Sequence, residues 1–421
     1  MLSGRRSLCG METELTKQQI AKKKMVRRQE NRKMSSVAGR RGETQAAHPA
    51  DEVVTVELTD IAQTGEAIGR VEGVVLFVPF GAPGDRAEVL ITERKRTFMR
   101  GRFLRLLDAA PQRVTPLCPH FTVCGGCEWQ HLPYDEQVRL KTTQVQTKLT
   151  RIGKLVDPTV LPCLPSPQLY GYRNHARLQR TATGRIGYRA ARSHEVIVVA
   201  TCPILEPTVN EMVQRLAGEP APASAGELEV RVVMPLQIGA YHYHITPDAF
   251  FQANTAVAAR LVTEVLAALK LQGTERVLEL YCGVGLFTVP IAATGASVLG
   301  VEANGVAIAD AHTNAALAGV TPQVTLLTAA VEEAVYLPAV QQERWDALLL
   351  DPPRAGIAGS ALSALLPLAL PKIVYVSCDP ATLARDAQIL CTNGYRLRYA
   401  QPLDMFPQTH HVETVALFER L

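Results

Sequence analysis

The spacing of apolar and polar positions divides the chain into stretches with different periods. Residues 52–107 contain short alternating segments, such as "EVVTVELTDIA" and "EAIGRVEGVVLFVPF", separated by turn residues such as "APGD". Alternation of this kind is typical of strands with one buried face. Short strands joined by tight turns close readily into a small barrel. We therefore predict a small antiparallel β-barrel within residues 51–110.

From about residue 250 the pattern changes to helices that alternate with strands. "TAVAARLVTEVLAAL" has the helical period, and the apolar strand segment "ERVLELYCG" follows it. Further apolar strand segments alternate with helical ones as far as "KIVYVSCDP". Nearly continuous apolar strands between helices are typical of a parallel sheet that is covered on both faces. The sequence therefore predicts the α/β class, with a doubly wound, Rossmann-like domain over residues 246–421.

The intervening residues 111–245 are expected to form an α+β central domain rich in arginine. "YGYRNHARLQR" and "GRIGYRAARSHEVIVV" read as strands on which basic and apolar residues alternate. These arginines could line a solvated strand face or contact an RNA backbone. We favour RNA because tyrosines that could stack on bases interleave with them. The residues concerned are Arg173, Arg177, Arg180, Arg185, Arg189 and Arg192, with Tyr170, Tyr172 and Tyr188.

Charge is distributed unevenly along the chain. Its formal net charge is +4, but residues 1–50 alone carry 12 Lys/Arg against 4 Asp/Glu. We expect these residues to form a disordered basic tail, which either adds sequence-independent affinity for nucleic acid or does little. A second basic patch, "RKRTFMRGRFLR" at Arg94–Arg105, falls on the third β segment of the predicted barrel and suits a phosphate-facing surface.

The sequence also suggests where the protein works. It contains no apolar run of the roughly 18 residues that a membrane helix needs, and its N-terminal residues include no apolar core of a secretory signal. We therefore expect a cytoplasmic protein without membrane contact, and nothing in the sequence demands more than a monomer. Nine cysteines in such a protein point to metal, cluster or catalytic roles rather than to disulfides.

Candidate ligand-binding residues follow the strands of the predicted α/β domain. "YCGVGLF" is a Gly-x-Gly turn between a strand and a helix, in which Gly283 and Gly285 would let the backbone approach a ligand. Glu302 ends the next strand, where an acid can hold ribose hydroxyls. Asp351 opens the rigid "DPPRAG" exit from a later strand. This arrangement suits NAD or S-adenosylmethionine.

Cys378 ends the strand that follows Asp351, at the edge of the sheet where open α/β folds bind ligands. A cysteine is often a small buried hydrophobe, but this position favours a nucleophile. Glu413 opens the last strand after the loop "DMFPQTHHV", within reach of the same pocket. A thiol and a carboxylate near S-adenosylmethionine suggest methylation of uracil at carbon 5. Cys378 would add to carbon 6 of a base flipped from its stack, and Glu413 would remove the carbon-5 proton.

Several motifs together carry a resemblance to a known family. "FFQAN", "YCGVGLF", "DPPRAG", "SCDPATLARD" and "DMFPQTHHVE" resemble those of the uracil-5-methyltransferases of structured RNA. The resemblance runs from about residue 52 to the end and is closest to the bacterial 23S rRNA enzymes. It implies that the barrel is a TRAM domain. It also implies the nucleophile Cys378 and the base Glu413, with S-adenosylmethionine bound by Gln252, Tyr281, Glu302 and Asp351.

The resemblance also identifies a base-contacting residue and two departures. Phe250 is expected to help hold RNA bases rearranged by flipping. The family usually has Asn after the nucleophile, where this chain has Asp379; an ionised Asp379 would raise the pKa of the Cys378 thiol. Where many members have a polar residue for the adenine, this chain has Ala330. Neither departure implies loss of activity.

A cysteine cluster precedes the predicted sheet of the central domain. "CPHFTVCGGC" contains Cys118, Cys124 and Cys127, and "VATCPILEP" supplies Cys202 as a fourth candidate ligand. Four thiolates suit either zinc or an iron–sulfur cluster. The resembled rRNA enzymes hold a [4Fe–4S] cluster with this spacing. The resemblance therefore implies a structural cluster near the RNA, with zinc as the alternative.

Three hypotheses about function remain at this point. The first is S-adenosylmethionine-dependent methylation of carbon 5 of a uridine in 23S rRNA, and a variant of it applies the same chemistry to the T-loop uridine of tRNA. The second is a non-catalytic RNA-binding or ribosome-assembly protein, which would not need Cys378 and Glu413. A dehydrogenase is the third, and it leaves both of these residues unexplained.

Overall fold

The computed structural model describes residues 52–62, 64–181, 183–191, 193–218, 226–231, 236–247 and 249–421. The side chains of residues 229 and 231 are not included in that description. The predicted basic tail and Arg192 lie outside the described residues. No helix within the described ranges is long and apolar enough to cross a membrane.

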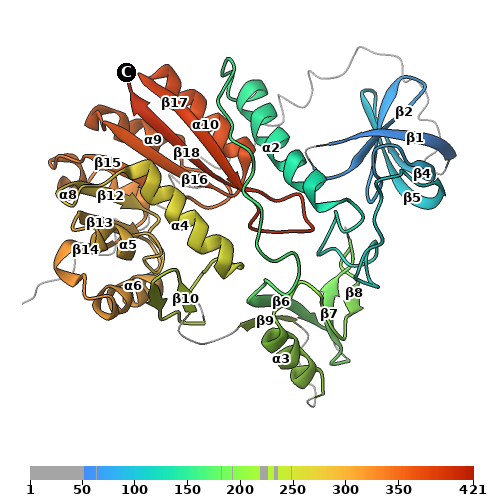
Figure 1. Ribbon diagram of the computed structural model, residues 1–421, viewed down its shortest axis with the longest axis horizontal. Helices are drawn as coiled ribbons and strands as arrows, with labels where there is room; N and C mark the ends of the chain where they lie inside the picture. The colour runs from blue at the N-terminus through green and yellow to red at the C-terminus, as the bar shows by residue number, and fades with distance from the viewer. Residues whose placement is uncertain are drawn as a thin grey trace, which may run out of the picture. The chain divides into compact units, whose positions relative to one another are not determined.

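The strands between Val53 and Asp108 form the predicted barrel (Figure 1). Its strands are β1 (Val53–Ile61), β2 (Ala67–Val71), β3 (Val74–Val78), β4 (Arg86–Arg94) and β5 (Phe98–Asp108). They close in the order β1-β2-β3-β5-β4. The pairing of β3 with β5 is parallel, whereas the other pairs are antiparallel. The long third β segment expected from the sequence is divided into β4 and β5. Leu58, Leu76 and Ile91 are fully buried in the barrel core.

The central part contains a four-stranded antiparallel sheet. Its strands are β6 (His175–Arg180), β7 (Ile186–Arg189), β8 (Val196–Val198) and β9 (Gly226–Arg231), in the order β8-β7-β6-β9. Helix α3 (Pro207–Gly218) packs Val209 and Val213 against this sheet. A hairpin of β10 (Leu236–Ile238) and β11 (Tyr241–Tyr243) follows. The helix on an antiparallel sheet agrees with the α+β expectation.

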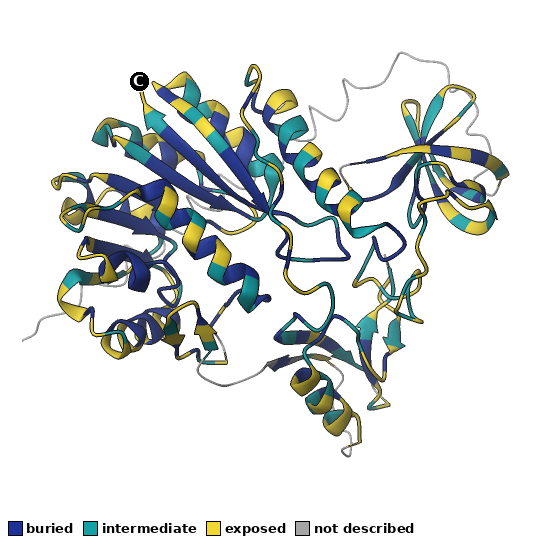
Figure 2. Ribbon diagram, viewed as in Figure 1, coloured by how far each residue is buried: buried dark blue, intermediate teal, exposed yellow. Residues whose placement is uncertain are grey.

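The C-terminal sheet has the order β14-β13-β12-β15-β16-β18-β17. Its strands are β12 (Arg276–Leu280), β13 (Ser297–Glu302), β14 (Val324–Thr328), β15 (Ala347–Leu350), β16 (Lys372–Ser377), β17 (Tyr395–Leu403) and β18 (Glu413–Arg420). The first five strands in the order are parallel, and β18 is antiparallel to both of its neighbours. Figure 2 shows most of this sheet buried. The doubly wound prediction is confirmed, with an antiparallel hairpin added at one edge.

Helices precede and connect these strands, and the sequence pattern predicts all of them except the two short helices between β14 and β15. They are α4 (Thr255–Leu269), α5 (Thr288–Ala293), α6 (Gly305–Leu317), α7 (Val331–Ala334), α8 (Pro338–Gln341), α9 (Gly359–Leu365) and α10 (Pro380–Thr392), with short 3₁₀ turns at Thr321–Gln323 and Leu366–Leu368. Asn254 and Asp379 cap α4 and α10 by accepting hydrogen bonds from first-turn N–H groups. Both caps lie in motifs that the sequence analysis singled out.

Helix α2 (Tyr134–Arg151) connects two hydrophobic cores. Leu140 is buried with the barrel residues, whereas Val145 and Leu149 are buried with α10 and the C-terminal sheet. The helix therefore packs partly on the C-terminal sheet, although its residues fall in the range expected for the central domain. Two of its polar residues, Gln137 and Lys141, are also buried. They contact the loop between β17 and β18.

Candidate active site

The expected site residues meet at the carboxyl edge of the C-terminal sheet. Glu302 ends β13, and Asp351 and Cys378 directly follow the parallel strands β15 and β16. Ser377 pairs with Thr414 across the antiparallel β16–β18 ladder, so that Glu413 begins its strand beside Cys378. The pKa values of Cys378 and Glu413 both respond to the charge of Asp351. The structure thus brings together side chains that are far apart in the sequence.

The glycine turn after β12 has the backbone that a ligand-binding turn requires. Gly283 and Gly285 have φ angles of +53° and +85°, and a Cβ atom added at Gly283 would meet open space. The N–H of Gly283 donates to Oε2 of Glu302 at 3.3 Å. Tyr281 adopts a φ of +66°, which is uncommon for a residue with a side chain and is concentrated at functional sites. The turn therefore places open backbone beside the Glu302 carboxylate.

Gln252 lies in the buried segment that leads into α4. Its carbonyl accepts a hydrogen bond from Nδ2 of Asn174 at 2.9 Å. The neighbouring Phe251 ring contacts Tyr243, whose hydroxyl donates to the carbonyl of Leu286 just after the glycine turn. These contacts bring the Gln252 segment to the same side of the sheet as the turn.

The thiol of Cys378 is half-buried among acidic groups. Burial, followed by the charges of Glu413 and Asp351, raises its pKa to about 12. The charge of Arg354 acts in the opposite direction and lowers this pKa. In the protein without ligands, Cys378 is therefore a protonated thiol at neutral pH. A nucleophilic role requires positive charge nearby to favour the thiolate.

The carboxyl groups at this edge also have raised pKa values. Burial and the Asp351 charge raise the pKa of Glu413 well above its usual range. Burial and the Glu302 charge raise the pKa of Asp351 to about 7. Closely spaced acids cannot all ionise at neutral pH, so this site can both hold and accept protons. Such groups are typical of functional sites.

Glu279 is a further buried acid that the sequence analysis did not single out. Burial raises the pKa of its carboxyl to about 8, and its Oε2 accepts a hydrogen bond from the Thr288 hydroxyl at 2.6 Å. Its Oε1 has no hydrogen-bond partner among the described residues. An acid within the apolar strand "RVLEL" was a visible signal in the sequence, because glutamate is rarely fully buried unless it is paired.

Asp379 and Arg354 form an ion pair next to the thiol. Asp379 Oδ1 accepts hydrogen bonds from the N–H groups of Ala381 and Thr382, and its Oδ2 lies 3.5 Å from Nε of Arg354. The charge of Asp379 contributes to the raised pKa of Cys378. The aspartate is thus a helix cap whose charge opposes formation of the thiolate, as expected from the sequence.

Ala330 and Phe250 are the remaining two positions to which the resemblance drew attention. Ala330 precedes α7, and its carbonyl accepts hydrogen bonds from the N–H groups of Glu333 and Ala334. Its side chain offers no polar atom to a ligand. Phe250 has 72% of its surface exposed. A large exposed aromatic ring beside the buried Gln252 segment is suited to stacking on a base.

The four expected cysteine ligands line one cavity of about 120 Å³. They are Cys118, Cys124, Cys127 and Cys202, and all are free thiols. Burial raises the pKa of Cys124 to about 11 and also raises that of Cys202. Among the described residues, no three His, Cys, Asp or Glu side chains are gathered so that they could hold one metal ion. The thiols therefore surround a cavity, to which Arg173, Arg177 and Tyr188 also contribute.

The arginines expected to contact RNA lie in the barrel and the central part, and their contact with RNA stays a prediction. On the barrel, Arg94, Arg100 and Arg105 form ion pairs with Glu52, Glu66 and Glu88, which reduces the charge they offer to phosphates. In the central part, Arg173 and Arg177 line the cysteine cavity.

The suggestion that Tyr172 stacks on bases is wrong. Its side chain is only 1% exposed, and its hydroxyl donates to the carbonyl of Pro407 at 3.0 Å. The sequence pattern could not distinguish this internal contact from a surface tyrosine.

Comparisons with known proteins agree with this geometry. The family model of the TRAM domain matches residues 51–104, and the model described as tRNA (uracil-5-)-methyltransferase matches residues 227–421. The chain is 35% identical to 23S rRNA (uracil(1939)-C(5))-methyltransferase RlmD of Edwardsiella ictaluri, over 87% of this chain and 96% of that protein. It is 33% identical to an uncharacterized RNA methyltransferase of Thermosynechococcus vestitus, over 86% and 97% of the two chains.

A solved structure is similar over nearly its whole length. It is the tRNA (uracil-54, C5)-methyltransferase of Pyrococcus abyssi in complex with S-adenosyl-L-homocysteine, with a TM-score of 0.67 and 25% identity. The match covers 86% of this chain and 99% of that one. An open α/β sheet with a glycine turn and acids at its strand ends suits NAD or S-adenosylmethionine, and the S-adenosyl-L-homocysteine in the matched structure favours the second. The chain belongs to the RNA uracil-5-methyltransferase family, and it methylates carbon 5 of uracil in RNA. The dehydrogenase and non-catalytic hypotheses are thereby set aside.

Proposed function

We propose that this enzyme methylates carbon 5 of a uridine in 23S rRNA, with Cys378 as nucleophile and Glu413 as base. The observation that carries the mechanism is the convergence of Cys378, Glu413 and Asp351 at one sheet edge. Relatives named for 23S rRNA, matched over 87% of this chain, support the choice of RNA. The TRAM domain supports RNA binding outside the catalytic domain.

The proposed reaction explains why a thiol and a carboxylate are needed together. Cys378 loses its proton to water, and its Sγ bonds to carbon 6 of the uracil as the double bond between carbons 5 and 6 opens and its electrons move toward the carbonyl oxygen at carbon 4. The resulting enolate is nucleophilic at carbon 5, which takes the methyl group. Glu413 then accepts the carbon-5 proton, and Sγ leaves with its electron pair as the ring double bond re-forms. S-adenosylmethionine supplies a methyl group on a positively charged sulfur, and that charge favours ionised acids and thiolate nearby.

The donor set at the glycine turn fits this cofactor. We assign the Gly283–Gly285 turn, with its open backbone at Gly283, to the methionine end and the Glu302 carboxylate to the ribose hydroxyls. Tyr281, Gln252 and Asp351 complete the set by resemblance. At Ala330 a backbone group would replace the usual side-chain contact with adenine.

We further propose that the four cysteines hold a structural [4Fe–4S] cluster. Four free thiols around a common cavity suit such a cluster, and Arg173 and Arg177 in the same lining suit a site near the RNA. A single zinc ion is the alternative. It would require the four sulfur atoms to lie about 2.3 Å from one point.

Replacing one cysteine tests the cluster assignment. Cys202→Ser should lower bound iron and acid-labile sulfide from about four of each per chain to a small fraction. Protein purified without oxygen should also lose its visible absorption. The matched variant Cys391→Ser changes a half-buried cysteine of α10 outside the cavity and should retain the iron. Stoichiometric zinc in the unaltered protein, with no iron, would contradict the assignment.

Asp379→Asn should make the enzyme faster at neutral pH. Asparagine caps a helix as well as aspartate does, but it removes the negative charge beside Cys378 and releases Arg354 from its ion pair. Both effects lower the pKa of the thiol, so kcat/KM at pH 7 should rise between about twofold and tenfold.

The pH profile checks the reason for this effect. In the unaltered enzyme kcat/KM should increase with pH from about pH 6 to about pH 9, because the thiol remains protonated below its raised pKa. The variant's profile should be displaced to lower pH. An unchanged profile would show that Asp379 has no influence on the thiol.

The substrate assignment is tested by offering two RNAs separately. Protein purified without oxygen is given labelled S-adenosylmethionine with unmodified 23S rRNA or unmodified tRNA, and 5-methyluridine is mapped by mass spectrometry. We expect label at a uridine of 23S rRNA. The tRNA T-loop is the second candidate, since the matching family model and the solved relative both carry tRNA in their names. Label in tRNA alone would keep the chemistry and overturn the rRNA assignment.

A further inference from the structure

The loop between β17 and β18, residues 404–412, is unusual because it is largely buried. Loops normally lie on the surface, since their backbone polar groups need water as a partner. Here Asp404 is fully buried, and Gln408 and Thr409 are at most 5% exposed. The loop leads directly into Glu413, the first residue of β18. Whatever supports this loop therefore also fixes the start of the strand that carries Glu413.

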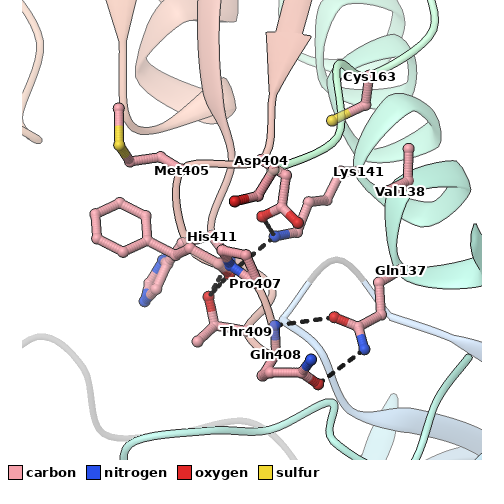
Figure 3. Close-up of polar contacts among 12 residues, drawn as sticks. Gln137, Val138, Lys141, Cys163, Asp404, Met405, Pro407, Gln408, Thr409 and His411 are labelled. Atoms are coloured by element: carbon pink, nitrogen blue, oxygen red, sulfur yellow. Dashed lines mark hydrogen bonds and ion pairs between the residues drawn. The ribbon is translucent and has the colours of Figure 1, made fainter. Parts of the chain in front are cut away.

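One support is a buried ion pair with α2. Lys141 Nζ donates to Oδ1 of Asp404 and, at 3.0 Å, to the carbonyl of Phe406 (Figure 3). Both charged side chains are completely buried. The other carboxylate oxygen of Asp404 accepts a hydrogen bond from the Tyr134 hydroxyl at 2.8 Å. Tyr134 and Lys141 of α2 thus hold the first half of the loop. They do so through the Asp404 side chain and the Phe406 carbonyl.

A second support is Gln137, which pairs with Gln408. The Gln137 side chain accepts from the N–H of Gln408 at 2.9 Å and donates to its Oε1 at 3.1 Å (Figure 3). The carbonyl of Gln408 accepts from the N–H groups of Glu128 and Trp129 at 3.1 Å and 3.0 Å. Gln408 adopts a φ of +70°, which is uncommon for a residue with a side chain. Its conformation is thus maintained by contacts from outside the loop.

Burying these charged and polar groups carries a desolvation penalty that offsets much of the stability their contacts contribute. A buried ion pair contributes little net stability, and apolar side chains of similar volume often serve as well or better. Buried polar groups of this kind are instead suited to specifying one arrangement. The arrangement specified here is that of the segment between Leu403 and Glu413, which are paired at the loop end of the β17–β18 hairpin.

We propose that Lys141 and Gln137 of α2 are positioning residues for the proton-transfer step. By fixing residues 404–412, they set the position of the Glu413 carboxylate relative to Sγ of Cys378. This inference rests on the proposed role of Glu413. It predicts that loosening the loop slows removal of the carbon-5 proton and leaves cofactor and RNA binding unchanged.

The test uses two variants of the full-length enzyme. Lys141→Met combined with Asp404→Asn removes both charges without leaving one unpaired in the core. Gln137→Met removes the contacts with Gln408, together with two donations to backbone carbonyls just before α2. Each should lower kcat by about 10-fold to 100-fold, since small misplacements of a catalytic group have effects of this size. KM for RNA and the Kd for S-adenosylmethionine should remain unchanged. Covalent protein–RNA adduct should accumulate on denaturing gels.

Two controls separate positioning from general destabilisation. Val145→Ala truncates a buried residue of the same helix that packs in the C-terminal core. It should lower the melting temperature without producing adduct. Glu413→Gln reports on the proposed function itself, because it should accumulate adduct even if α2 has no such role.

The outcomes are then distinct. Adduct in Glu413→Gln and in the α2 variants supports the proposal. Adduct in Glu413→Gln alone, with normal kcat in the α2 variants, overturns it while leaving the proposed function intact. No adduct in Glu413→Gln overturns both. If the variant with both Lys141→Met and Asp404→Asn fails to fold, kcat and adduct formation in Gln137→Met distinguish these outcomes.

Discussion

Cys378→Ala should abolish methyl transfer to RNA, with turnover falling by about 10³-fold or more. The alanine cannot bond to carbon 6, so carbon 5 of the uracil remains a poor nucleophile. Because Cys378 lies at the sheet edge after β16 and is only half-buried, its truncation should leave the fold and RNA binding nearly unchanged. Transfer of labelled methyl groups and a gel-shift titration with the same RNA measure the two properties.

The matched control for this variant is Cys391→Ala. Cys391 lies near the end of α10, the helix that follows Cys378, and packs against the neighbouring core. It should retain turnover. Substantial methylation by Cys378→Ala would refute the nucleophile assignment, whereas equal losses in both variants would indicate damage to α10 instead.

Glu413→Gln should have a different signature from loss of the nucleophile. Methyl transfer to carbon 5 can proceed, but the glutamine cannot accept the proton, so Sγ cannot leave. Multiple turnover should fall by about 10² to 10⁴-fold, the usual contribution of a positioned base. Methylated RNA should remain covalently attached to the protein as a slowly migrating band on a denaturing gel.

Glu419→Gln is the matched control on the same strand. Glu419 is more exposed and forms an ion pair with Arg398 at the opposite end of β18, away from the site. It should neither slow turnover nor form adduct. If Glu413→Gln also releases its RNA normally, another group takes the proton.

The elements of the fold were largely predictable because each has a strong local signal. The apolar period of α4 and the continuous apolar strands β12, β15 and β16 correspond to the expected segments. Helix α2 was not predicted, because its buried face includes polar residues such as Gln137 and Lys141 that disguise the apolar period. The parallel pairing of β3 with β5 joins distant segments and leaves no signal in a local window.

The site was predictable where it follows strand ends and not where it depends on long-range partners. The convergence of Cys378, Asp351 and Glu302 was predicted because parallel strands end at one edge of a sheet. The partners of Asp404 and Gln408 lie on α2, more than 200 positions earlier in the chain, and no pairing rule connects them. Tyr172 was assigned to the surface because no local pattern reveals its partner. Its hydroxyl donates to the carbonyl of Pro407 in the loop between β17 and β18.

The central claim, a covalent bond between Cys378 and carbon 6 of uracil, can be tested directly by trapping. RNA containing 5-fluorouridine presents a fluorine that Glu413 cannot remove, so the reaction should stop after methyl transfer. The complex is digested with protease and nuclease, and the cross-linked peptide is identified by mass spectrometry. The account predicts a methylated fluorouridine attached to the peptide that contains Cys378, and only in the presence of S-adenosylmethionine as methyl donor. Attachment to another residue, or its absence while uridine-containing RNA is methylated normally, would contradict it.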